Sequence, residues 1–63
     1  MLNDFLEVPG GAIRVCHIDR IYALNGSLYA AVSSGTGVYI GKVPAGRDPN
    51  SEAEALYYRL KHS

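Results

Sequence analysis

The chain has 63 residues, with six basic and six acidic side chains and a formal net charge of zero. This balance removes the broad positive field of proteins that bind nucleic acids or membrane surfaces, so we expect neither as a partner. The single cysteine excludes an intrachain disulfide, and one cysteine with two histidines does not match the spacing of a structural zinc site.

A chain this short forms one domain, residues 1–63, whose small core leaves a thin margin of stability. Because a disulfide and a zinc site are excluded, we expect self-association into a homo-oligomer to provide further support. Residues 1–8 carry early acids and no basic leader, and no apolar run approaches the ~20 residues that span a bilayer. We therefore expect a cytoplasmic protein without a membrane partner.

The first predicted hairpin joins two short runs, residues 4–8 and residues 12–16, through the turn sequence Pro9-Gly10-Gly11. With the two glycines as the turn, apolar side chains face one another on one side and opposite charges on the other. Residues 17–20 follow as a short turn that leads into the central sheet. The expected pairs are Val8 with Ile13, Glu7 with Arg14, and Leu6 with Val15.

Residues 21–43 organise the rest of the chain and predict three strands joined by two turns. Asn25-Gly26 is the strongest hairpin signal, because a two-residue type I′ turn needs positive φ at both central positions. The second turn, SSGTG at residues 33–37, is less sharply defined. The first turn pairs Leu24 with Ser27, Ala23 with Leu28, Tyr22 with Tyr29, and Ile21 with Ala30. A five-residue second turn pairs Val32 with Val38, Ala30 with Ile40, and Tyr29 with Gly41.

Alternation along these strands sorts the side chains onto two faces of the predicted sheet. Lys42 falls at the edge of the aliphatic face, where its stem can lie on apolar surface. A second turn shorter by one residue would move residues 38–43 to the opposite faces. The aliphatic face carries Ile21, Ala23, Leu28, Ala30, Val32, Val38 and Ile40. The tyrosine face carries Tyr22, Leu24, Tyr29, Ala31, Tyr39 and Val43.

The hydrophobic period changes after a loop at residues 44–49. Ala53, Leu56, Tyr57 and Leu60 recur at helical spacing, so they predict one apolar stripe on an amphipathic helix. This stripe needs a partner, and the aliphatic face needs a cover. We therefore predict an α+β fold, a small antiparallel five-stranded sheet with one C-terminal helix packed on one face. The tyrosine face is then left on the outside.

Two capping arrangements are open at the start of this helix. Ser51 with Glu54 fits a capping box, and Asp48 followed by Pro49 offers an earlier cap.

The tyrosine face is the main candidate for a binding surface, since tyrosine combines a wide, rigid contact area with a polar tip. We favour an interface over a plain solvated face, because large exposed apolar patches are uncommon on monomers. Its partner stays open between a second subunit, another polypeptide and a stacked base. The SSGTG turn could hold a phosphate through backbone N–H groups, but it lacks the Walker spacing and lysine, and an ordinary turn is favoured. The candidate ligand-binding residues are Tyr22, Tyr29, Tyr39, Arg20, Arg47, Ser34 and Thr36, with Lys42 as a further cation.

No catalytic or metal-binding arrangement emerges from the sequence. Cys16 and His17 are adjacent, so on a strand they point to opposite faces and cannot form a nucleophile–base pair. We expect Cys16 to be a small buried hydrophobe and His17 a surface turn residue. Glu52 and Glu54 lie two apart on the predicted helix and do not face one another. We therefore expect no enzyme, no metal and no cofactor.

The spacing Ile13-x-Val15-x-His17-Ile18-x-x-Ile21, followed by a strand, a glycine turn, a strand and an acid-rich helix start, resembles the short FlbD-like and phage-encoded sheet-plus-helix proteins. The resemblance covers about residues 6–60 and rests on hydrophobic pattern and glycine placement. The loop at residues 44–49 is longer than that pattern expects. The resemblance implies an origin in a phage or mobile element, and no site residue is carried over from it.

Three functions are compatible with these features. The favoured one is a non-enzymatic, homo-oligomeric binding protein that sequesters a nucleotide-like small ligand, as small phage proteins sequester host signals. The alternative is a protein–protein interaction module, either an inhibitor of a host factor or an assembly domain. An RNA-binding regulator ranks third, because phosphate contacts normally dominate affinity and this chain is neutral.

Overall fold

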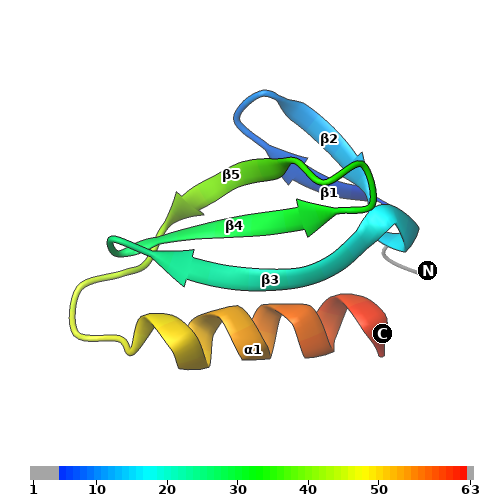
Figure 1. Cartoon of the computed structure of the whole chain (residues 1–63). Coiled ribbons are helices and arrows are strands. Elements are labelled where there is room, and N and C mark those ends of the chain that lie inside the picture. The colour runs from blue at the N-terminus through cyan, green and yellow to red at the C-terminus, as the bar shows by residue number, and fades with distance from the viewer. Residues whose placement is uncertain (1–4, 63) are drawn as a thin grey trace.

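A computed structural model of the protein describes residues 5–62, and Asp4 of the predicted first strand lies outside this range. All strand pairs are antiparallel, and the strands form a two-stranded sheet, β1-β2, and a three-stranded sheet, β3-β4-β5 (Figure 1). The predicted α+β fold, with one C-terminal helix packed on a sheet, is confirmed. The elements are β1 (Phe5–Val8), β2 (Gly11–Arg14), a 3₁₀ turn η1 (Val15–His17), β3 (Ile18–Leu24), β4 (Ser27–Val32), β5 (Gly37–Lys42) and α1 (Pro49–Lys61).

The β1–β2 hairpin turns one step earlier than predicted, at Pro9 and Gly10. Leu6 therefore pairs with Ile13 rather than with Val15, so the predicted register is wrong by two residues. Proline favours the first central position of a turn because its φ is already set, and it has no N–H for a ladder. A shift of two residues keeps every side chain on its face, so the apolar pairing survives.

Between the two sheets the chain makes the 3₁₀ turn η1 rather than extending β2 to Cys16. Val15 and Ile18, three residues apart, are both buried, as the period of a 3₁₀ turn allows. Cys16 and His17 fall between them and are exposed. The expectation that Cys16 is buried is therefore wrong, and the expectation that His17 is a surface turn residue is confirmed.

The β3–β4 hairpin follows its turn signal. Asn25 and Gly26 have φ of 53° and 76°, the positive values that a type I′ turn requires. The four predicted pairs, from Leu24 with Ser27 to Ile21 with Ala30, are all present. Tyr22 consequently stands opposite Tyr29, on the face that points away from the core.

The β4–β5 turn is tighter than the predicted five-residue loop. The backbone N–H of Val32 donates to the Thr36 carbonyl at 3.1 Å, and Val38 pairs with Ala30 instead of Val32. The predicted register is again wrong by two residues, so the faces are preserved as far as Tyr39. A β-bulge at Ile40 then shifts the register by one residue.

Beyond this bulge, Lys42 stands opposite Ser27 on the outer face, not at the edge of the aliphatic face as expected. Val43, expected on the tyrosine face, lies outside β5.

Helix α1 packs on the aliphatic face, mainly along β3 and in part on β4 (Figure 1). Ala30 of the sheet is 0% exposed and Ala53 of the helix 3%, so two small residues let the layers approach closely. Around them lie the other predicted stripe residues, which are partly buried against the core. These are Leu56, Tyr57 and Leu60.

Both ends of α1 are held by specific bonds. Asp48 is the N-cap, because its carboxylate accepts from the Ser51 N–H at 3.0 Å, and Pro49 begins the helix, so the earlier of the two predicted caps is the one used. At the other end the Lys61 ammonium donates to the Val15 carbonyl at 3.0 Å, which ties the helix to η1.

Truncation of the apolar stripe is expected to destabilise the fold strongly. Leu56→Ala removes a side chain that packs on the core, so it should lower the free energy of unfolding by about 2 kcal/mol, near the lower end of the range for leucine truncation. Urea unfolding followed by far-UV circular dichroism measures this loss. The matched control is Tyr58→Ala on the same helix, whose side chain is 65% exposed and whose loss should change stability by no more than about 0.5 kcal/mol. Equal losses in the two variants would show that the stripe is not the core contact.

Candidate functional site

The outer face of the three-stranded sheet is an ordered grid of nine side-chain positions, set by the register of β3, β4 and β5. Residues that stand opposite one another form three rows, each of which crosses the three strands. Neighbouring strands lie ~4.8 Å apart. We call these nine residues the outer grid. Its rows are Arg20–Ala31–Gly37, Tyr22–Tyr29–Tyr39 and Leu24–Ser27–Lys42.

The three tyrosines of the middle row contact one another. The Tyr22 and Tyr29 rings are stacked, with centroids 5.6 Å apart and planes at 15°, and the Tyr39 ring meets Tyr29 edge-on at 5.6 Å and 69°. Such arrangements suit the quadrupole of the ring and stabilise the cluster beyond the area it buries. Tyr22 and Tyr29 are half-buried, while Tyr39 is 39% exposed. The three rings are therefore packed against one another, and the most exposed ring of the row is that of Tyr39.

Arg20 completes this cluster at the edge strand. Its guanidinium carbon lies 5.1 Å from the centroid of the Tyr22 ring, which is within range of a cation–π interaction. Within residues 5–62, the one carboxylate–cation pair is Arg47 with Glu52, so Arg20 is not paired with a described carboxylate. The three phenol hydroxyls of the row likewise make no hydrogen bond to any described residue.

The outer grid differs in charge from the rest of the chain. It holds two cations, Arg20 and Lys42, in rows on either side of the tyrosines, and it holds no acidic residue. The chain as a whole has zero net charge. Asp19 precedes Arg20 at a β-bulge in β3 and is exposed beside the grid, but the nine grid positions themselves hold two cations and no carboxylate, which favours an anionic partner.

The structure brings together some of the predicted site residues and separates others. Arg20 and the three tyrosines meet in the outer grid, and Ser34 and Thr36 lie in the β4–β5 turn at the Arg20 end of the sheet. Arg47 lies in the loop before α1, at the opposite end of the sheet from that turn (Figure 1), and its guanidinium binds Glu52 at 3.0 Å.

Lys42 joins the grid through the β-bulge, which sequence reasoning missed. A glycine inside a strand often marks a bulge, so Gly41 was the available signal.

The SSGTG turn uses part of its backbone internally. The Ser33 N–H donates to the His17 carbonyl at 2.9 Å, and the Gly35 N–H donates to the Val32 carbonyl at 2.8 Å. These two N–H groups are therefore not directed at a ligand, and the favoured reading of the segment as an ordinary turn agrees with this geometry.

Three further findings concern metal-ligand clusters, membrane-spanning helices and similarity to known proteins. Across the described residues, histidine, cysteine and carboxylate side chains do not gather in any group of three or more that could hold a metal ion. Among the same residues, α1 has neither the length nor the apolar character to cross a membrane. No protein-family model, curated protein or solved structure matches this chain significantly.

The close contact of Tyr22 with Gly37 gives a test of the outer grid. A Cβ at Gly37 would collide with the Tyr22 hydroxyl, so Gly37→Ala is expected to push the Tyr22 ring out of its stack with Tyr29. Near-UV circular dichroism and the NMR shifts of the tyrosine rings should both change. The hydroxyl is the end of a mobile side chain, so the fold should persist. Gly41→Ala on the same strand is the control, because a Cβ there meets no atom within 4 Å. Unchanged tyrosine signals in Gly37→Ala would contradict the described stack.

Proposed function

We propose that this protein is a non-catalytic binding protein that sequesters a nucleotide-like small ligand on the outer grid. The observation that carries the proposal is the row of three tyrosines with Arg20 against its first ring, within nine grid positions that hold no acidic residue. Such a ligand joins a planar ring to an anionic group, and the grid offers a partner for each.

The aromatic part of the site supports the planar half of the ligand. Tyr39 is the most exposed ring of the row and lies at its open end, so a base can stack or pack on it without displacing Tyr22 or Tyr29. Stacking of a base on an aromatic side chain contributes ~1–3 kcal/mol and tolerates different bases. The free phenol hydroxyls add hydrogen bonds to ring nitrogens or exocyclic groups.

The cations support the anionic half. The Arg20 guanidinium presents several donors in a plane, which suits a phosphate better than a point charge does. Lys42, in the third row, places a second positive charge on the far side of the tyrosines. The nine grid positions hold no histidine, cysteine or carboxylate, so the proposal is storage of an unchanged ligand rather than a reaction.

Nucleotide binding is tested by calorimetry with a panel of cyclic and linear nucleotides. Tyr39→Ala should weaken binding roughly fivefold to a hundredfold through lost stacking. Arg20→Ala should lower the affinity for nucleotides more than the affinity for the corresponding nucleosides. The controls are matched: Tyr58→Ala removes another exposed tyrosine, and Arg14→Ala removes another arginine that lies on an aromatic ring, 5.4 Å from the Phe5 centroid. Absence of heat across the panel, with a folded protein, would reject the proposal.

The alternative is a protein–protein interaction module, either an inhibitor of a host factor or an assembly domain. It is supported by Leu24, which is 53% exposed at a corner of the outer grid. An exposed leucine beside exposed tyrosine is typical of a surface that another polypeptide covers.

Homo-oligomerisation is part of the main proposal, and the surface that mediates it separates this proposal from the alternative. Among the described residues the buried hydrophobic core consists of Val15, Ile18, Ile21, Ala30 and Ala53, which is little for a stable domain. We expect sedimentation velocity to show concentration-dependent association of the wild type. If Leu24→Ser with Tyr39→Ala abolishes association and Tyr58→Ala does not, the outer grid is a subunit interface and the alternative holds. If the wild type is a monomer at all concentrations, self-association is excluded from both the main proposal and the alternative. The phage or mobile-element origin and the cytoplasmic location stay predictions.

A further inference from the structure

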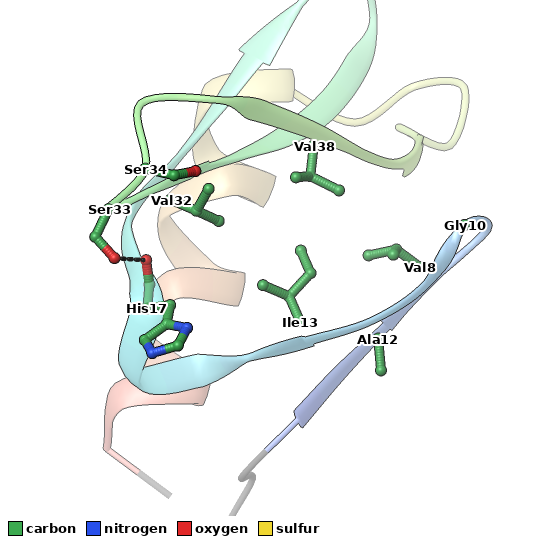
Figure 2. Close-up of a pocket in the computed structure, with 9 residues that line it drawn as sticks. All are labelled: Val8, Gly10, Ala12, Ile13, His17, Val32, Ser33, Ser34 and Val38. Atoms are coloured by element: carbon green, nitrogen blue, oxygen red, sulfur yellow. Dashed lines mark hydrogen bonds between the residues drawn. The ribbon is translucent and has the colours of Figure 1, made fainter.

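A hollow lies on the opposite side of the three-stranded sheet from the outer grid. It is a half-open hollow of about 480 Å³ between the β1–β2 hairpin and the ends of β4 and β5 (Figure 2). Figure 2 shows the side chains of Val8, Ile13, Val32 and Val38 converging on this space from the two sheets. The hollow exists because α1 covers β3 and part of β4, whereas the hairpin reaches the sheet through β5.

The polar groups of the hollow are gathered at one end. Ser33 donates to the His17 carbonyl through its N–H at 2.9 Å and its hydroxyl at 3.4 Å, so η1 is fastened to the β4–β5 turn. The Ser34 hydroxyl and the His17 imidazole also line this end, on either side of Ser33 (Figure 2). Neither makes a hydrogen bond to another described residue.

We propose that this hollow binds a small amphipathic carboxylate. The apolar body lies between the valines and Ile13, and the carboxylate accepts hydrogen bonds from Ser34 and His17. The volume falls within the ~300–1,000 Å³ typical of small-molecule sites, and an apolar lining with a few convergent polar groups is their usual composition.

The residues that line the hollow also favour a negatively charged head group on the ligand. Among residues 5–62 no acidic side chain lines the hollow, so an ammonium head would find no counter-charge from these residues. A hydroxyl and an imidazole N–H can each donate to a carboxylate, and hydrogen bonds to a charged acceptor are stronger than neutral ones. This inference does not depend on the nucleotide proposal, because the two surfaces lie on opposite sides of the sheet.

Amide NMR titration with octanoate, octanol and octylamine tests the site and its head-group preference together. Octanoate should shift the amides of Val8, Ile13, Val32 and Val38 while those of Tyr22 and Leu24 on β3 stay in place. It should bind about tenfold more tightly than octanol, and octylamine more weakly than either. Each methylene added to or removed from octanoate should change affinity about fourfold if the chain is buried.

Variants separate the apolar body from the head-group end. Val38→Phe fills the hollow and should abolish the shifts. Because a core-facing substitution can disturb folding, the second pair is Ser34→Ala and His17→Ala, both at exposed positions. Either substitution should lower the affinity for octanoate to that of octanol and leave the affinity for octanol unchanged. Tyr39→Ala is the control and should have no effect. Equal affinity for the three head groups, shifts outside the hollow, or no shifts in the folded protein would overturn the proposal.

Discussion

The type I′ turn at Asn25 and Gly26 fixes the pairing of β3 with β4, and both faces of the sheet depend on that pairing. On the inner side it sets Ile21 opposite Ala30, which the helix covers. On the outer side it sets Tyr22 opposite Tyr29. Strand side chains alternate with a period of two, so a slip of one residue would exchange the two sets and bring phenols against α1. The core and the candidate binding surface are therefore specified by the same two turn residues.

The bulge in β5 serves both faces in a way that a regular strand could not. Val38 faces inward opposite Ala30 and Tyr39 faces outward opposite Tyr29. The extra residue in the bulge is Ile40, and the Ile40 side chain packs against the core. Beyond it, Lys42 points outward opposite Ser27. A regular strand would have directed Lys42 toward the aliphatic side. The bulge thus adds a second cation to the outer grid without loss of apolar contact, as bulges beside binding sites often do by re-aiming a side chain.

Local turn chemistry predicts the elements well and predicts their exact pairing only where a turn has one solution. Asn25-Gly26 has one, so its hairpin follows directly from the sequence. Pro9-Gly10-Gly11 and SSGTG each allow turns of different length, and both predicted registers were wrong by two residues. That error preserves the faces, so the tyrosine row was predictable even though the pairing of Tyr29 with Tyr39 was not. The bulge at Ile40, the exposure of Cys16 and the hollow depend on how distant segments pack together, which periodicity does not encode.

Helix α1 and the β1–β2 hairpin divide the cover of the aliphatic face, and this division places two unlike surfaces on either side of one strand. The helix leaves β5 to the hairpin, and the hairpin approaches without closing the gap at Val38. One residue away, Gly37 lies beneath the Tyr22 hydroxyl on the outer side. A ligand in the hollow and a ligand on the outer grid would both constrain the same turn and strand. If the two ligands influence one another through this strand, thermodynamic linkage makes the effect equal in both directions.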